Sequence, residues 1–382
     1  MQIVVLAGPY SRTSEALAGA IKRAPEEENR ILEWFCAQQV DTGLCLSQDG
    51  GPHPNVCFTY DQALSVFVFG LEGEWERASR ILDFFLQEVK KQRAEGTGFR
   101  GFADSYRADG SVDARSAAAG PNGWLGMATN YFCSKNPDGA SRDKYLSLSK
   151  TLAEWLWSLR NEDGGIRGGF DEIGNAFSWI STEHNADCYA FFQQLGKLTG
   201  KKAYKERARQ IARFMEEHLW YEPEGRFFNG LNDANFATDV SAWTVCAFGS
   251  KYERGLDFAM RRARCQKYYS RARTEVDGFD FGGSYTDSHY PDLDSVWFEG
   301  TAQMVIAFQE VGRREEADYF FQSLTRCLTP SSMHNGTLGL PYASNPGTPA
   351  GGGWTMFDDR LCVSSSAWYL FAARNFNPFG KF

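Results

Sequence analysis

Acidic and aromatic residues recur together where apolar segments of this sequence begin. Glu183 and Asp187 lie at the start of one such segment, and Asp239 and Glu299 lie at the starts of two others. A pair of carboxyl groups can cleave a glycosidic bond, because one donates a proton to the leaving oxygen while the other activates water or attacks directly. Aromatic rings stack on the apolar faces of sugar rings. The pattern therefore indicates carbohydrate chemistry.

We expect Glu183 to be the acid, because it precedes its apolar segment in a loop and can reach inward, and Glu299 or Asp239 to be the base. Burial and neighbouring carboxylates would raise the pKa of the acid. Taken singly, Asp61 or Asp239 is more often a helix cap than a catalyst, and core packing also explains Trp243 and Trp368. Their coincidence favours a binding site whose remaining members are expected to be Tyr60, Asp61, Asn122, Trp124, His184, Asn185, Asp187, Trp243, Trp297, Trp354 and Trp368.

Histidines and glycines give no sign of a metal or cofactor site. The histidines other than His184 (53, 218, 289 and 334) show no ligand spacing beside it, so no metal and no cofactor is expected. His184 is explained either as a hydrogen-bonding residue at the end of the ring or as a ligand of a sugar hydroxyl. Three glycines before Trp354 lack the lysine and the following helix of a phosphate loop. They predict a lid or a subsite wall, or a glycine-rich turn with a packing tryptophan.

Two kinds of helix alternate along the chain and would position these residues. One kind is charged, with a single apolar stripe that would face the core; it is expected at 26–40, 74–93, 142–161, 202–220, 252–273 and 313–328. The other kind is apolar nearly all round and must be buried; it is expected at 60–71, 122–132, 185–198, 240–248, 299–311 and 365–373.

Six charged and six apolar helices in strict alternation predict an all-α toroid of six helical hairpins, an (α/α)6 barrel with an inner and an outer ring. The apolar segments recur at intervals of 56 to 67 residues, and short connectors alternate with long ones. All inner helices would begin at one end, where the long connectors also open; long loops in a compact domain are usually functional. Small β pieces are expected in them, near 98–106, 226–231 and 278–285. The whole chain is expected to be one domain, with residues 1–25 as an N-terminal extension.

The alternating hairpins and the residue types at the inner-helix starts resemble the six-hairpin glycosidase superfamily over nearly the whole chain. The resemblance implies a glycoside hydrolase that acts on an oligosaccharide or polysaccharide, with inversion expected. Sugar epimerases or isomerases and polysaccharide lyases share the fold and remain alternatives. Epimerases of this fold use paired histidines, whereas only His184 stands at an inner-helix start here, with His289 in a loop. A terpenoid-type toroid and a non-catalytic toroid that binds a glycan or a protein also remain, although Asp358 and Asp359 alone are a thin acidic motif for the former.

Composition excludes some partners. The net charge is −8, which argues against nucleic acid and against an anionic membrane surface, because both reward clustered lysine and arginine. One basic stretch, from Arg261 to Arg273, is expected to be the solvated face of an outer helix. No window of the sequence approaches the roughly 18 uninterrupted apolar residues of a membrane helix, and residues 1–8 do not form a full signal peptide. The nine cysteines are scattered without a CxxC pair, which indicates a reducing, cytoplasmic location without a disulfide framework; a secreted or periplasmic protein whose leader has been removed is the alternative.

Overall fold

The computed structural model is a closed ring of helical hairpins and confirms the predicted toroid. It describes residues 25–51, 54–96, 98–136, 138–283, 295–345, 348–349, 355–356 and 360–382. The predicted N-terminal extension, residues 1–25, lies outside these residues except for Pro25, where the first helix begins.

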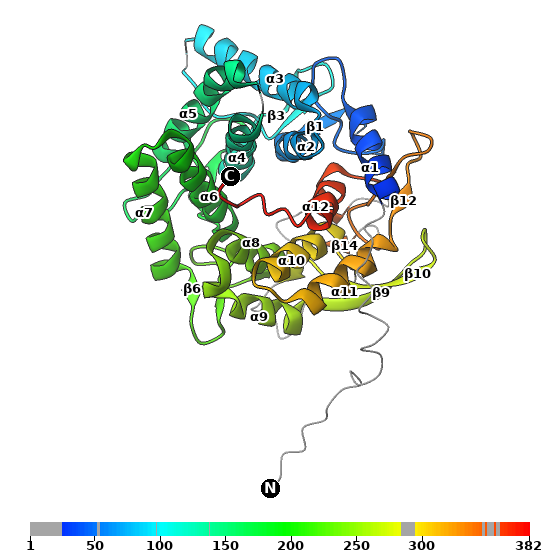
Figure 1. Ribbon diagram of the computed structural model, residues 1–382. Coiled ribbons are helices and arrows are strands. Elements are labelled where there is room, and N and C mark those ends of the chain that lie inside the picture. Colours follow the sequence, from blue (N-terminus) through cyan, green and yellow to red (C-terminus); the bar gives the residue numbers. More distant parts are fainter. Residues whose placement is uncertain are drawn as a thin grey trace.

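Six helices form the inner ring of Figure 1 and six form the outer ring. The inner helices are α2 (Thr59–Leu71), α4 (Ala119–Lys135), α6 (Thr182–Thr199), α8 (Thr238–Phe248), α10 (Phe298–Glu310) and α12 (Val363–Ala373). The outer helices are α1 (Pro25–Gln38), α3 (Trp75–Ala94), α5 (Arg142–Ser158), α7 (Lys202–His218), α9 (Arg254–Arg262) and α11 (Arg314–Thr325). Two 3-10 turns, η1 (Gly139–Ser141) and η2 (Gly249–Tyr252), precede α5 and α9.

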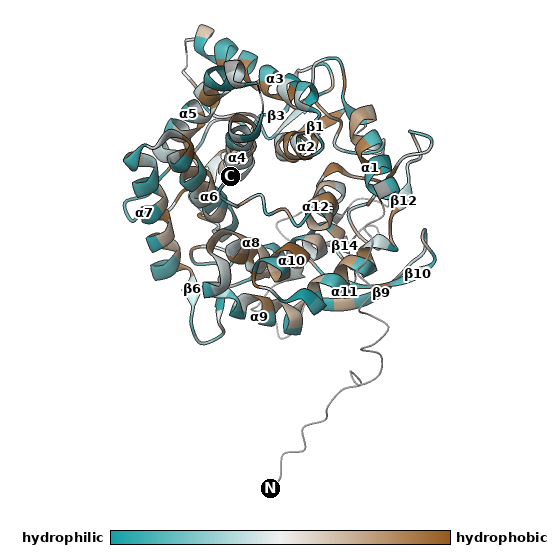
Figure 2. Cartoon of the chain, in the orientation of Figure 1, coloured by the Kyte–Doolittle hydropathy of each residue, from teal (hydrophilic) through white to brown (hydrophobic). Residues whose placement is uncertain are grey.

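The two rings divide polar and apolar residues as the sequence predicts. Figure 2 shows teal, hydrophilic residues mainly on the outer helices and brown, hydrophobic residues mainly on the inner ones. Every residue of α12 is buried, as are nearly all residues of α2, α8 and α10. In α3, by contrast, a buried stripe that includes Ile81, Phe85 and Val89 faces the core. No helix in the described part of the chain is long and apolar enough to span a bilayer.

The long connectors contain short β-strands, as predicted, and these strands pair with one another. One three-stranded sheet has the order β1-β2-β3, with β1 (Val56–Phe58), β2 (Ser105–Arg107) and β3 (Val112–Ala114). The other strands form antiparallel pairs: β4 (Ala117–Ala118) with β5 (Gly169–Phe170), β6 (Trp220–Tyr221) with β7 (Arg226–Phe227), β8 (Phe236–Ala237) with β11 (Gly282–Gly283), β9 (Arg264–Tyr269) with β10 (Thr274–Phe279), β12 (Thr329–Pro330) with β13 (Leu338–Gly339), and β14 (Thr348–Pro349) with β15 (Thr355–Met356).

The prediction of a single outer helix over 252–273 is wrong in its second half. Helix α9 ends at Arg262, and the basic stretch then continues into the hairpin of β9 and β10. Six residue pairs form this hairpin, and Arg273 closes its turn with φ +52°. Arginine, alanine, lysine and glutamine have good helix propensity, but tertiary pairing overrides such a preference.

The first residue of every inner helix donates its backbone N–H to a connector of the next hairpin. This bond recurs six times at 2.8–3.0 Å and closes the ring: Thr59 to Asp104, Ala119 to Gly168, Thr182 to Asn229, Thr238 to Phe281, Phe298 to Tyr342 and Val363 to Ser47. The inner-helix N-termini are therefore held in one plane, because each is tied to its neighbour at the same position.

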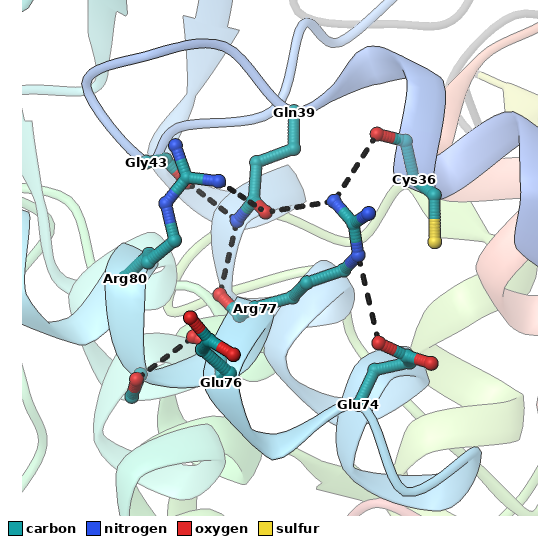
Figure 3. Close-up of polar contacts among 8 residues, drawn as sticks. Cys36, Gln39, Gly43, Glu74, Glu76, Arg77 and Arg80 are labelled. Atoms are coloured by element: carbon teal, nitrogen blue, oxygen red, sulfur yellow. Dashed lines mark hydrogen bonds and ion pairs between the residues drawn. The ribbon is translucent and has the colours of Figure 1, made fainter.

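Outer helices are also tied to one another, as Figure 3 shows for α1 and α3. The Gln39 amide donates to the carbonyl oxygens of Gly43 and Arg77, both at 2.9 Å. Its Oε1 accepts from the guanidinium groups of Arg77 and Arg80, both at 3.3 Å. Arg77 also pairs with Glu74 at 3.6 Å. One glutamine side chain thus joins the end of the first outer helix to the second.

The fourth residue of five inner helices clamps the connector that precedes it. Asn185 illustrates this clamp: its Oδ1 accepts from the Ile166 N–H at 2.8 Å, and its Nδ2 donates to Ile166 O and Ser181 O at 3.0 and 2.8 Å. The same position carries Gln62, Asn122, Thr301 and Ser366, each bonded to backbone in its own connector. Ser241 in α8 makes no such bond among the described residues.

Asn185→Ala should therefore destabilise the fold by about 3 kcal/mol, because the buried N–H and C=O of Ile166 would lose their partners at about 1–3 kcal/mol each. Ser241→Ala is the matched control at the same position of the repeat and should cost less than about 1 kcal/mol. Urea denaturation measures both free energies of unfolding. Equal losses in the two variants would contradict the clamp.

Candidate active site

Three carboxyl groups stand at one equivalent position on three consecutive inner helices. Glu183, Asp239 and Glu299 are the second residues of α6, α8 and α10. Asp239 and Glu299 are 5% and 7% exposed, and Glu183 is half-buried. A common position in the repeat, together with the bonds that hold the helix starts in one plane, brings the three groups to the same level of the ring.

Tyr60 shows that this position faces the centre of the ring. It is the second residue of α2, yet its hydroxyl donates to Glu299 Oε1 at 2.8 Å and accepts from the Trp368 indole N–H at 2.7 Å. Its ring also lies 5.2 Å from that of Trp124 and 6.4 Å from that of Trp243. One side chain thus contacts α4, α8, α10 and α12, which is feasible only near the axis.

The three carboxyl groups have raised and unequal pKa values. Burial, followed by the charges of Asp239 and Glu299, raises the pKa of Glu183 well above its ordinary value. Burial raises the pKa of Asp239 to about 6, against the lowering effect of the Val240 N–H. Burial raises the pKa of Glu299 to about 7, although the hydroxyls of Tyr60 and Ser364 lower it. At neutral pH the arrangement therefore favours a protonated Glu183 beside an ionised Asp239.

One turn deeper, three of the six inner helices carry a tryptophan as their sixth residue. Trp124, Trp243 and Trp368 lie here, with ring centroids 5.2–6.2 Å apart and exposed fractions of 0–3%. They pack against one another as a floor beneath the carboxylates. Their contact with a sugar ring stays a prediction.

Asp187 lies in the same layer and is fully buried. Burial, followed by the charges of Glu183 and Asp239, raises its pKa well above the ordinary value. The Trp124 indole lies close enough to lower this pKa slightly, but no hydrogen bond of normal geometry reaches either carboxyl oxygen or the indole N–H of Trp124 or Trp243 among the described residues. Buried polar atoms without partners point to water or a polar ligand at this level.

His184 occupies space near the centre of the ring that a side chain at Gly120 of α4 would otherwise fill. Its imidazole lies on Gly120, the second residue of α4, where a Cβ atom would come within 2.3 Å of the ring. Burial lowers the pKa of His184 to about 4, so the imidazole is neutral at pH 7. The Ser181 hydroxyl caps α6 by accepting the His184 backbone N–H at 3.1 Å. Nδ1 of His184 has no partner among the described residues.

Several other predicted binding residues have their polar groups engaged in the fold. The amides of Asn122 and Asn185 are bonded to connector backbone, which favours a structural role. Trp297 folds its ring over Gly300 of its own helix and contacts Phe281 at 4.9 Å. Asp61 is buried beside Ser47. Trp354 and His289 lie outside the described residues.

Because of the buried carboxyl group of Asp61, the free energy of unfolding should fall as the pH rises. Burial raises its pKa to about 8, so the folded state keeps a proton that the unfolded state, with a pKa of about 3.9, has lost. The stabilisation is complete below the unfolded pKa and is lost as pH rises through the folded one. Glu299 acts in the same direction. The free energy of unfolding should therefore fall between about pH 4 and about pH 8, the interval between the unfolded and folded pKa values of Asp61, and level off above it.

Asp61→Asn should flatten this dependence, since the amide keeps the shape of the acid but does not titrate. Urea denaturation at several pH values in that window measures the slope. A wild type of constant stability, or an Asn variant with an unchanged slope, would contradict the assignment. The exposed control Glu172→Gln should leave the slope unchanged.

Two polar residues of the site were not predicted from the sequence. Gln303, the sixth residue of α10, donates to Glu299 Oε1 at 3.1 Å, and Ser364, the second residue of α12, lowers the pKa of Glu299. Both occupy positions of the repeat at which four of the other five inner helices carry predicted residues. Aligning the six helix starts by position would have found them.

Among the described residues no group of three or more His, Cys, Asp or Glu side chains could hold a metal ion. All nine cysteines are free thiols.

The sequence matches no protein-family model and no curated protein. Solved structures do match over more than nine tenths of the chain. A wild-type glycosidase has a TM-score of 0.66 at 11% identity and covers 93% of this chain and 97% of its own. A cellobiose 2-epimerase from Bacillus thermoamylovorans has a TM-score of 0.65 at 11% identity, with coverages of 92% and 98%. A D-mannose isomerase has a TM-score of 0.62 at 10% identity, with coverages of 92% and 95%. The chain thus has the six-hairpin, glycosidase-like (α/α)6 fold.

Proposed function

We propose that the protein is a glycoside hydrolase that cleaves an oligosaccharide or polysaccharide with inversion. The observation that carries the proposal is the set of three carboxyl groups, two buried and one half-buried, at one position of α6, α8 and α10, whose pKa values differ in the way that acid and base catalysis requires. Support comes from the fold, since one glycosidase of this fold was solved with glucose bound, at a TM-score of 0.65 and 12% identity.

In this mechanism Glu183 donates its proton to the glycosidic oxygen as the bond between that oxygen and the anomeric carbon breaks. The bonding electrons remain with the leaving group, which departs as an alcohol. Asp239 takes a proton from a water molecule, whose oxygen bonds to the anomeric carbon from the opposite face. The turnover ends with Glu183 ionised and Asp239 protonated, and exchange of one proton restores both groups.

Glu299 is proposed to position rather than to transfer a proton. Its Oε1 is already engaged by Tyr60 and Gln303, and Ser364 also stabilises its ionised form. Asp239 carries one hydrogen bond from the Val240 N–H, at 2.7 Å, on Oδ1. The second oxygen of Asp239 is therefore the better acceptor for a proton from water.

A panel of gluco-, manno- and galacto-configured oligosaccharides in both anomeric series tests the proposal. Proton NMR in D2O follows the anomer released first and any exchange at carbon 2. Hydrolysis with an inverted first product is expected. Release of a sugar with its configuration retained would overturn inversion, and deuterium at carbon 2 without hydrolysis would overturn the hydrolase in favour of an epimerase or isomerase, the activity that other proteins of this fold carry.

The base is tested by comparing Asp239→Asn with Glu299→Gln in the presence of sodium azide. Azide can replace the activated water as the nucleophile, so it should restore turnover of an activated glycoside in the variant that lacks the base. Rescue of Asp239→Asn, with an inverted glycosyl azide as product, is expected. Rescue of Glu299→Gln instead would exchange the two roles.

A further inference from the structure

The connector before α6 carries a stacked pair of aromatic side chains, of which Trp179 is exposed and Phe177 is half-buried. The rings of Phe177 and Trp179 lie 5.1 Å apart with an interplanar angle of 30°. Trp179 is 44% exposed, and Ile173 in the same connector is 85% exposed. Large apolar side chains are rarely this accessible in the described chain, which makes their grouping in one connector a feature that needs an explanation.

This pair is held firmly in place. The Trp179 ring covers Gly168, where a Cβ atom would come within 2.4 Å of it, and the carbonyl of Trp179 accepts the Gly168 N–H at 3.0 Å. The Asp171 carboxylate accepts the N–H groups of Ile173 and Asn175 at 3.0 and 2.7 Å and fixes the turn. A preformed aromatic surface loses little conformational entropy when a ligand binds.

The aromatic surface is continuous with the candidate active site. Trp179 contacts the His184 ring with centroids 5.3 Å apart, and His184 lies on Gly120 at the centre of the ring. Glu183, the proposed acid, is the neighbour of His184 and begins the helix to which this connector leads. Phe177, Trp179 and His184 thus form a path from solvent to the position of the acid.

The other end of the ring is closed. Trp124, Trp243 and Trp368 form a floor below the carboxylates, and Phe379 packs under it at 5.2 Å from Trp124 and 5.6 Å from Trp243. Among the described residues, a sugar bound at the carboxylates therefore meets this aromatic packing on one side, and the rest of its chain can extend toward the inner-helix N-terminal end. Because the acid must contact the bridging oxygen, the group beyond that oxygen lies on the solvent side of Glu183.

We propose that Phe177 and Trp179 form the subsite for the leaving group, and that this group is a pyranose whose apolar face stacks on Trp179. The inference rests on the proposed hydrolase function. Sugar rings match the site because their C–H faces pack on an indole while their hydroxyls stay in water. The substrate is accordingly an oligosaccharide rather than a glycoside of a small alcohol.

Kinetics with two leaving groups test the subsite. The substrates are the disaccharide that the panel identifies and the glycosyl fluoride of the same glycon, which leaves nothing to stack. Trp179→Ala should raise KM for the disaccharide at least tenfold and leave KM for the fluoride within twofold. Trp179→Phe should restore most of the loss. The control Tyr268→Ala, which removes a 55% exposed aromatic residue from β9, should change neither KM.

Equal KM changes for both substrates, or no change for either, would overturn the subsite. Failure of the subsite and of the proposed function are distinguishable. If only the subsite is wrong, the wild type still cleaves the disaccharide and Glu183→Gln still does not. If the hydrolase is wrong, the wild type cleaves neither substrate. Fluorescence titration of Glu183→Gln with the disaccharide adds a readout without turnover: the change in tryptophan emission should be smaller in the double variant with Trp179→Phe, in which only the tryptophans below the carboxylates still respond.

Discussion

Glu183→Gln should lower kcat for oligosaccharide hydrolysis by roughly 10²–10⁴-fold, the contribution of a positioned general acid. The amide keeps the size of the side chain but has no acidic proton to give to the leaving oxygen. The burial and neighbouring charges that raise the pKa of Glu183 would no longer serve catalysis. This is the largest effect on activity that the site predicts.

Substrates with different leaving groups show whether this loss of kcat comes from the missing proton transfer. Dinitrophenolate leaves a glycoside without being protonated. The kcat for a dinitrophenyl glycoside should therefore fall far less in Glu183→Gln than the kcat for the oligosaccharide. Steady-state kinetics with both substrates measure the two losses. Equal losses would mean that Glu183 does not act as the acid. The control Glu172→Gln changes an exposed carboxylate in the preceding connector and should leave both rates within twofold.

The largest effect on stability is expected from removing residues 375–382, which cross the centre of the ring in red in Figure 1. Phe376 and Phe382 pack on Phe67 and Tyr131 with centroids 5.0–6.1 Å apart, and Phe379 packs on the tryptophan floor. The Gln194 amide donates to the carbonyl oxygens of Pro378 and Gly380, both at 2.9 Å. Truncating a buried Phe to Ala costs about 3–5 kcal/mol, so the deletion should cost at least that much.

Because a total stability of about 5–15 kcal/mol leaves little margin, the deletion itself is expected to yield a largely unfolded chain. Single substitutions keep the prediction measurable. Phe379→Ala should lower the free energy of unfolding by about 3–5 kcal/mol and Phe379→Leu by about 1.5 kcal/mol or less, as followed by urea denaturation. Lys381→Ala is the control within the same segment, since only the backbone of Lys381 is bonded, to Lys197. A Phe379→Ala variant as stable as this control would contradict a structural role for the segment.

The order and kind of the helices could be predicted from the sequence because burial leaves a strong periodic signal. Charged segments with one apolar stripe became outer helices, and segments without charge became inner ones. The stretch from Arg264 to Tyr269 could not be predicted in this way, because its composition suits a helix and only its pairing with β10 makes it a strand. The packing of residues 375–382 also escaped prediction, since three phenylalanines in a terminal segment do not reveal what they contact.

Which side chains point to the centre of the ring depends on how each inner helix is rotated about its own axis. Each residue turns the helix by about 100°, and the predicted starts of the inner helices differ from the observed ones by one to three residues. The list of candidate residues therefore mixed side chains at the axis, such as Glu183, with clamps such as Asn185 that face the connector. His184 lies against Gly120 only because α4 lacks a side chain there, a pairwise fact that no single segment contains.

The last of the six recurring bonds, from Val363 to Ser47, has a consequence for how the protein folds. It joins segments more than 300 residues apart, together with the neighbouring bond from Asp49 N–H to Leu361 O at 2.9 Å. Every other bond of the series links adjacent hairpins, so their loops close at a lower entropic cost. We expect hairpins to assemble progressively into an open arc, and the seam between α12 and α2 to form in the slowest step. Until that step the arc exposes two unpaired ends, and the seam is where a folding intermediate of this toroid would aggregate.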